Sequence, residues 1–195
     1  MTRDRFYTIR TRLKVVCDID VTDEEKKNRL WKVKRRILQG CLRQKRSEHI
    51  SIDEMIIPFT GTCGLKQYCP NKPNPVGLKV FVAANPDGLV LDMVVYQGEK
   101  TFEDYVYQGF SLCEAAILRL SESLVPGHYL YFDRYFSTTK LLNELHLRGF
   151  NSTGSIMNNR VPKGCTLSDD KDFIKKPRGT TEVKCRADGK LAIMK

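Results

Sequence analysis

The hydrophobic pattern of this 195-residue chain changes period near residue 49. Before that point, apolar residues recur at helical spacing. After it, short apolar runs bounded by turn residues are typical of strands. The strands are predicted at about 49–56, 77–84, 89–96, 128–133 and 150–156, and the helices between them at about 111–124 and 138–146.

Residues 1–46 are predicted to be helical. Thr22 can cap a helix, and Glu25 follows three residues later, as a capping box requires. The apolar stripe that follows consists of Leu30, Val33, Ile37, Leu38 and Leu42. Basic residues occupy the opposite face, which is either an ordinary solvated side or a side that lies along a phosphate backbone. These helices cannot close a core alone, so we expect them to pack on other material.

The order of the elements predicts the fold class. Asn85-Pro86-Asp87-Gly88 is a strong turn signal, so the second and third strands should be antiparallel neighbours. Ser137 is the predicted cap of the helix that follows it. The later strand–helix–strand crossovers require parallel pairing. The result is an α/β fold, a partial ribonuclease-H-like mixed sheet of order β-β-β-α-β-α-β, although other small α/β folds share this order.

Three segments are predicted: a basic helical segment (1–46), the mixed-sheet core (47–157) and a looser polar region (158–195). The last segment contains a hairpin around Ala187-Asp188-Gly189. The chain stops within the second arm of that hairpin, which suggests a truncated sequence.

Charge points to a polyanionic partner. Charged residues make up 29% of the chain, the net charge is +10 and the isoelectric point is about 9.3. Basic domains without nucleic-acid function are common, so charge alone leaves both possibilities open. Ranked by charge and position, the DNA-binding candidates are Lys34, Arg35, Arg36, Lys72 and Lys79.

The seven cysteines favour a reducing compartment. Their number is odd, no CxxC pair occurs, and no second close pair joins Cys63 and Cys69 to form a zinc site. Free, mostly buried thiols are expected. No apolar run reaches membrane-spanning length, and the first residues are not a secretion signal. We expect a cytosolic or nuclear protein, with the nucleus favoured by the charge.

Two aspartates are the candidate metal-binding residues. Asp53 interrupts the first strand, and Asp133 ends the fourth strand, 80 positions later. If these strands are neighbours, both carboxylates can face one pocket and bind Mg²⁺ or Mn²⁺ ions that activate the attacking oxygen and stabilise the leaving oxygen of a phosphodiester. The alternative is that Asp53 is hydrogen-bonded near a sheet edge and Asp133 caps the turn before Ser137.

Several segments together resemble the piggyBac-type transposases. They are Ile52-Asp53-Glu54-Met55-Ile56-Ile57-Pro58-Phe59-Thr60-Gly61, Tyr68-Cys69-Pro70-Asn71-Lys72-Pro73, Gly77-Leu78-Lys79 and Tyr131-Phe132-Asp133-Arg134-Tyr135-Phe136-Ser137-Thr138. The resemblance implies a ribonuclease-H-like domain that cuts and rejoins DNA. It makes Asp53 and Asp133 the first two catalytic and metal-binding aspartates, with Mg²⁺ or Mn²⁺ as cofactor, and makes 158–195 the start of an insertion.

The chain departs from the family pattern in three respects. No Asp stands in a matching third catalytic block, and Asp188 in its turn is a poor candidate. The scattered cysteines cannot supply the family's C-terminal zinc module. Arg134 stands where the family often has Asn, and a cation there competes with the metal for Asp133.

The combined prediction is a piggyBac transposase-derived protein that binds transposon-end-like double-stranded DNA without full cleavage or strand-transfer activity. One alternative is an active nuclease or transposase that uses Glu54 or Asp92 as its third carboxylate. Another is a scaffold protein without DNA activity, and a third is a fragment that does not fold stably alone. A homodimer stays an open alternative, and no membrane partner is expected.

Overall fold

The computed structural model describes residues 1–13, 22–23, 30, 33–70 and 72–195, without the side chains of 33–35. Their contacts divide the chain into two units, Met1–Lys45 and Arg46–Lys195, and each is described here by itself. The predicted capping box lies outside the described residues, because Glu25 is not among them. The same holds for the helical prediction over 14–21, 24–29 and 31–32.

The described parts of the first unit are helical, as predicted. They are α1 (Arg3–Arg12), the π-helical turn η2 (Val33–Leu38) and α3 (Gln39–Leu42). Thr2 caps α1, with its hydroxyl accepting a hydrogen bond from the Arg5 amide at 3.4 Å. No residue of α1 or α3 is buried, and Phe6 is 48% exposed.

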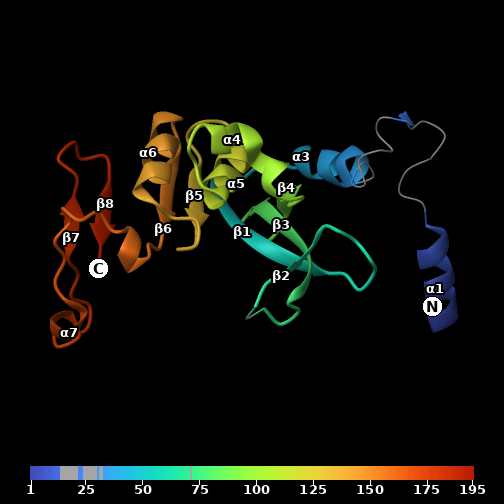
Figure 1. Ribbon diagram of the computed structural model, residues 1–195, viewed down its shortest axis with the longest axis horizontal. Coiled ribbons are helices and arrows are strands. Elements are labelled where there is room, and N and C mark those ends of the chain that lie inside the picture. Colours follow the sequence, from blue (N-terminus) through green and yellow to red (C-terminus); the bar gives the residue numbers. More distant parts are fainter. Residues whose placement is uncertain (14–21, 24–29, 31–32, 71) are drawn as a thin grey trace. The chain divides into compact units, whose positions relative to one another are not determined.

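A mixed sheet forms the centre of the second unit (Figure 1). Its strands are β1 (His49–Pro58), β2 (Lys66–Tyr68), β3 (Val76–Ala84), β4 (Val90–Val95), β5 (Tyr129–Phe132) and β6 (Asn151–Gly154). β3 is antiparallel to β1, β2 and β4, whereas β5 is parallel to both β1 and β6. The predicted hairpin and the predicted parallel half of the sheet are both confirmed.

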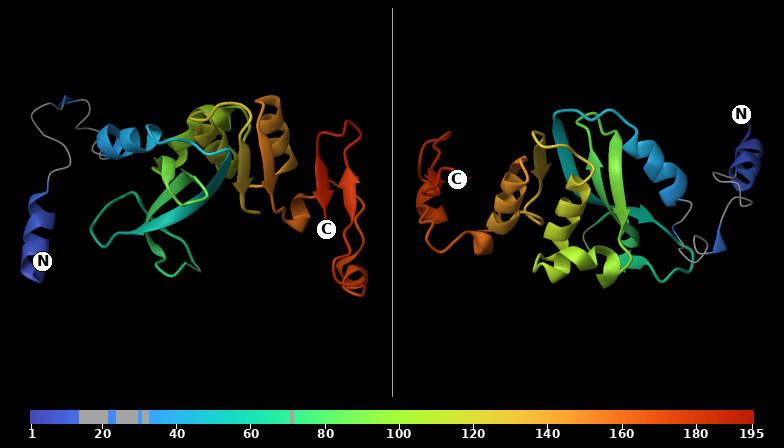
Figure 2. Two further views of the ribbon diagram at one scale, coloured as in Figure 1. Left: turned by 180° about the vertical axis from the view of Figure 1, so that it is seen from behind. Right: turned by 90° about the horizontal axis from the view of Figure 1, so that it is seen from above.

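Helices cover one face of this sheet. The main ones are α5 (Leu112–Ser121) and α6 (Thr139–Leu147), preceded by η3 (Glu99–Phe102) and α4 (Glu103–Tyr107). Ile50, Phe81, Leu118, Leu130 and Leu141 are fully buried in one common cluster, so strands and helices share a single core. Figure 2 shows the sheet and these helices from two further sides.

The sequence pattern missed β2 and α4. β2 has three residues, which is too short to show a period of two, and α4 lies in a stretch that reads as a polar connection. The predicted cap of α6 was wrong by one residue. Thr138, not Ser137, accepts the hydrogen bond from the Leu141 amide, at 3.0 Å.

The last part of the second unit contains η4 (Asn158–Arg160), the short helix α7 (Asp170–Phe173) and the predicted hairpin, formed by β7 (Val183–Cys185) and β8 (Ala192–Met194). Across the described residues, no helix combines the length and the apolar character needed to span a membrane.

Candidate functional site

The two predicted aspartates meet at one end of the β1–β5 pair. The parallel register pairs Ser51 with Tyr131 and Ile52 with Phe132. Continued by one residue, it places Asp53 opposite Asp133. Neighbouring strands lie about 4.8 Å apart, so the two backbones approach each other closely at this point.

Asp53 and Asp133 also lie on one face of the sheet. In a strand, successive side chains point to opposite faces, and Ile50 and Ile52 face the helix-covered core. The odd-numbered residues of β1 therefore face the other side. A cross-strand contact on that side agrees with this, because His49 Nδ1 lies 3.0 Å from the Tyr131 hydroxyl. Both aspartates are exposed there.

Each carboxylate is oriented by a backbone amide. Asp53 Oδ1 accepts a hydrogen bond from the Glu54 amide at 2.7 Å, and Asp133 Oδ1 accepts one from the Tyr135 amide. In the described part of the chain, no hydrogen bond reaches the second oxygen of either group. Two exposed carboxylates with free oxygens are the hard donors that Mg²⁺ and Mn²⁺ prefer. The donor set fits part of a divalent-metal site.

The turn that follows Asp133 is closely packed. The Asp133 carbonyl accepts hydrogen bonds from the amides of Phe136 and Ser137 and from the Ser137 hydroxyl, at 3.0 to 3.2 Å. Gly154 of β6 passes so near that an added Cβ would lie 2.3 Å from Ser137 Oγ. Arg134 is exposed at the start of the turn. The peptide that carries Asp133 is thus held against β6.

A neutral pair of side chains adjoins this turn. Burial, and then a hydrogen bond to Cys113, raises the pKa of Tyr135 to about 12. Burial also raises the pKa of the Cys113 thiol. Both groups are therefore protonated at neutral pH. Lys79 Nζ lies 3.5 Å from the Tyr135 hydroxyl and 5.0 Å from the centre of its ring, so this predicted DNA-binding residue lies beside the turn after Asp133.

Glu54 does not extend the pair of aspartates. It follows Asp53 directly, so it belongs to the opposite, core-facing side of β1 together with Ile52. Its carboxylate pairs instead with Lys72, at 3.3 Å. Lys72, another predicted DNA-binding residue, is therefore held in an ion pair with a residue of the opposite side of β1.

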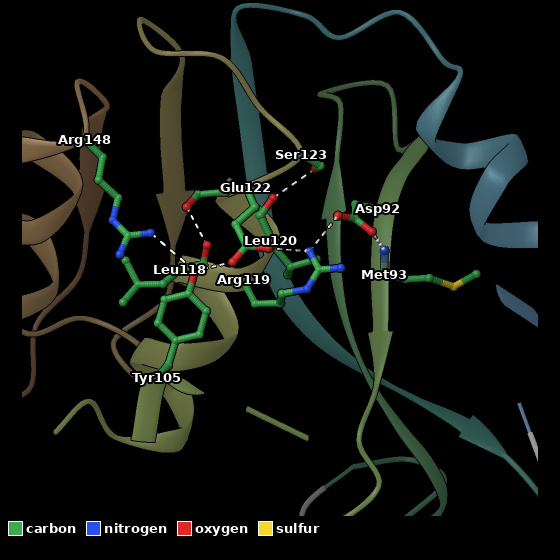
Figure 3. A network of polar contacts seen from close by, with 10 residues as sticks. Asp92, Met93, Tyr105, Leu118, Arg119, Leu120, Glu122, Ser123 and Arg148 are labelled. Carbon is green, nitrogen blue, oxygen red and sulfur yellow. Dashed lines mark hydrogen bonds and ion pairs between the residues drawn. The ribbon is translucent and has the colours of Figure 1, made fainter. Parts of the chain in front are cut away.

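Asp92, the other alternative third carboxylate, also lies away from the pair. Its backbone is opposite Ala83, a core residue, and its side chain is 1% exposed. Oδ1 accepts a hydrogen bond from the Met93 amide at 2.7 Å, and Arg119 Nη1 of α5 lies 3.9 Å from Oδ2 (Figure 3). Asp92 is therefore part of the polar network beneath α5 and not of the open face.

The burial of Asp92 makes stability depend on pH. Burial raises its pKa above the ordinary value, and hydrogen bonding and the nearby arginines offset this only in part. A raised pKa means that the protonated carboxyl is favoured on folding. The stabilisation is complete below the ordinary pKa and is lost as pH rises through the folded value.

We therefore expect the effect of Asp92→Asn on the free energy of unfolding to become more favourable from pH 3.5 to pH 7. The gain should be about 1.4 kcal/mol for each tenfold difference between the acid constants of the folded and unfolded chain. Urea denaturation at both pH values measures it. The control is Asp104→Asn, which removes the exposed carboxylate of α4. An effect that becomes less favourable as pH rises would refute the assignment.

The other predicted DNA-binding residues belong to the first unit. Lys34 and Arg35 belong to η2, but their side chains are not described, and Arg36 is exposed in the first unit.

Among the described residues, no group of three or more His, Cys, Asp or Glu side chains could hold a metal ion. Six cysteines lie among the described residues. Five are half-buried and Cys185 is exposed, so the expectation of mostly buried thiols was wrong.

Sequence reasoning missed Arg160. Its guanidinium donates hydrogen bonds to three carbonyls of the turn after Asp133. The only signal was its place in a basic, turn-rich stretch, which does not indicate what a side chain contacts. Tyr135 was noted only as part of the motif around Asp133.

Comparisons with known proteins identify the family of this chain. The family described as Transposase IS4 matches residues 1–195. The human PiggyBac transposable element-derived protein 3 is 29% identical over 97% of this chain, and so is the human Chimeric ERCC6-PGBD3 protein. The chain spans 32% of the length of the first relative and 18% of the second.

A solved structure shares the fold. It is the cryo-EM structure of a piggyBac transposase synaptic complex with hairpin DNA, with a TM-score of 0.69 and 21% identity, and the match covers 95% of this chain and 39% of that one. At this identity the likeness shows the fold alone, which is the predicted ribonuclease-H-like mixed sheet. Through the match along its whole length, the chain belongs to the Transposase IS4 family, and its relatives are piggyBac transposable element-derived proteins.

Proposed function

We propose that this chain binds double-stranded DNA through phosphate contacts and holds a divalent ion at Asp53 and Asp133, without completing strand transfer by itself. The observation that supports the proposal is the register of β1 and β5, whose last pair, Ile52 and Phe132, is directly followed in the two neighbouring strands by the exposed residues Asp53 and Asp133. Resemblance to the piggyBac transposases supports the same assignment, with Mg²⁺ or Mn²⁺ as the ion. When bound, the ion would polarise a phosphodiester and its attacking oxygen.

The two carboxylates provide an incomplete set of protein ligands. The other acids considered for the site, Glu54 and Asp92, pair with Lys72 and Arg119 and belong to the opposite face. Two carboxylates can bind Mg²⁺ together with water and phosphate oxygens. A two-metal reaction must position both the attacking and the leaving oxygen, which requires more protein ligands than two carboxylates. This is why we propose DNA binding rather than strand transfer.

Electrostatics support a DNA partner. The chain carries a net charge of +10, Lys79 contacts Tyr135 in the turn after Asp133, and Lys72 pairs with Glu54, the residue after Asp53. Lys79 is held by the Tyr135 hydroxyl, which is a neutral partner, so its full charge is available to a phosphate. Lys72 shares its charge with Glu54 and is the weaker candidate.

The affinity for duplex DNA should therefore fall steeply with salt, because each phosphate contact releases counterions. Fluorescence anisotropy of a labelled duplex from about 50 to about 200 mM salt measures the slope. Lys79→Gln should lower the slope by about 1. Lys175→Gln, which alters an exposed lysine outside the predicted set, is the matched control. An affinity that does not change with salt is the outcome that rules out phosphate contacts.

A cleavage assay separates the proposal from the enzyme alternative. The chain is incubated with Mn²⁺ and transposon-end duplex DNA, beside Asp53→Ala and Asp133→Ala variants. We expect no cleaved product above background from any of the three. Cleavage by the unaltered chain that both variants lose would show an active nuclease. A chain that binds neither DNA nor Mn²⁺ would favour the scaffold alternative.

A DNA partner also implies residence in the nucleus. We propose this localisation from the charge and the family resemblance, and nuclear fractionation tests it. The oligomeric state is a separate question, which light scattering of the DNA-bound chain answers.

A further inference from the structure

Arg160 joins two segments that are 25 residues apart in sequence. It ends η4, which follows β6. Its Nη1 donates hydrogen bonds to the carbonyl of Tyr135 at 2.9 Å, of Arg134 at 3.1 Å and of Ser137 at 3.2 Å. Nη1 carries two N–H groups, so at least one of them is shared between two of the three carbonyls.

These three carbonyls belong to the turn that orients Asp133. The Tyr135 amide donates to Asp133 Oδ1, and the amides of Phe136 and Ser137 donate to the Asp133 carbonyl. Two of the peptide groups that contact Asp133, those carrying the Tyr135 and Phe136 amides, are therefore held by Arg160 from their other side, through the carbonyls of Arg134 and Tyr135. Loss of Arg160 would free three carbonyls and loosen the amide that orients the carboxylate.

We infer that Arg160 is the positioning residue of the metal site: it holds the turn 134–137 so that Asp133 faces Asp53 across the β1–β5 pair. The inference rests on the proposed metal-binding function. Arg160 does not touch the carboxylate itself in the described contacts, so it acts through the backbone of the turn.

Because Arg160 is positively charged, the inference can be tested by whether its removal raises or lowers the Mn²⁺ affinity. A cation near a metal site repels the metal, so its removal by itself would strengthen metal binding. If Arg160 instead positions Asp133, its removal should weaken metal binding. Residues that orient metal ligands through hydrogen bonds typically contribute 10-fold to 100-fold in affinity. Arg160→Ala should therefore weaken Mn²⁺ binding by about 10-fold, despite the lost positive charge.

The first measurement is the Mn²⁺ dissociation constant of the full 195-residue chain, from electron paramagnetic resonance of free Mn²⁺. Arg160→Lys should retain part of the affinity, because an ammonium can still serve one or two carbonyls. The control is Arg134→Ala, which removes an exposed cation adjacent to Asp133. It should leave binding unchanged or strengthen it.

The second measurement needs no metal. Amide hydrogen exchange by NMR should show faster exchange of Tyr135, Phe136 and Ser137 in Arg160→Ala, by about 10-fold. The amides of the β1–β5 ladder should keep their rates. This pattern also shows that the variant is folded.

The outcomes distinguish the two proposals. Unchanged exchange in the turn, or Mn²⁺ binding as tight as in the unaltered chain, overturns the role of Arg160 and leaves the metal site standing. An unaltered chain that binds no Mn²⁺ overturns the metal site and this inference together. Weaker binding with faster turn exchange supports both.

Discussion

Asp53→Asn and Asp133→Asn should each reduce the Mn²⁺ affinity of the chain by more than about 10-fold, the lower limit typical of residues that only support a ligand. The reason is the geometry where the pairing of β1 and β5 ends, because Asp53 and Asp133 directly follow its last pair, Ile52 and Phe132. A neutral amide is a poorer ligand than a carboxylate for a hard divalent cation. The change in size is small, and each amide oxygen can still accept the hydrogen bond from the Glu54 or Tyr135 backbone.

The double variant tells whether one site is involved. If both carboxylates contact the same ion, the combined loss should be smaller than the sum of the two single losses, since the first change already disrupts the site. Electron paramagnetic resonance of free Mn²⁺ measures all three variants, with Asp104→Asn as a control that removes a distant exposed charge. Fully additive losses would indicate two independent sites. Single variants that bind as tightly as the unaltered chain would show that these residues are not ligands.

Phe136→Ala should cost about 3–5 kcal/mol of the free energy of unfolding. Phe136 is fully buried and packs edge-on against Phe81, with ring centres 6.2 Å apart. It is also the residue that anchors the turn after Asp133 in the common core. Because a domain of this size has only about 5–15 kcal/mol of stability in total, the variant should lose a large fraction of its stability.

Urea denaturation followed by circular dichroism measures this loss. The control is Tyr107→Ala, which removes an aromatic ring that is 83% exposed and should change stability by less than about 0.5 kcal/mol. Phe81→Ala and the double variant complete the comparison, since aromatic pairs contribute about 0.5–1.5 kcal/mol beyond their buried area. A loss at Phe136 no larger than at Tyr107 is not compatible with a buried anchor.

The two experiments are connected through the turn 134–137. Phe136 holds the turn from the core side, and Arg160 holds it through three carbonyls. Stability depends mainly on the first contact, because it buries a large apolar surface. Metal affinity should depend more on the second, because it sets the direction of the Asp133 carboxylate.

The sequence by itself determined the elements that have a clear period. Alternation and turn residues located the five main strands of the sheet, and helical spacing located α5 and α6. Once β1 and β5 were taken as parallel neighbours, Asp53 and Asp133 could be expected to lie near each other, because each follows the last paired residue of its strand by one position. These features are local, or they follow from the handedness and length of crossover connections. One sequence therefore suffices to predict them.

Only the tertiary structure decided which acids share the exposed face of the sheet with Asp53 and Asp133. From the sequence, Glu54 and Asp92 were both candidates for a third carboxylate. The fold places both on the core-facing side of the sheet and pairs them with Lys72 and Arg119. It also brings Arg160 to the turn after Asp133. Such contacts join residues that are distant in the chain, and their partners depend on packing, which leaves no period or spacing in the sequence.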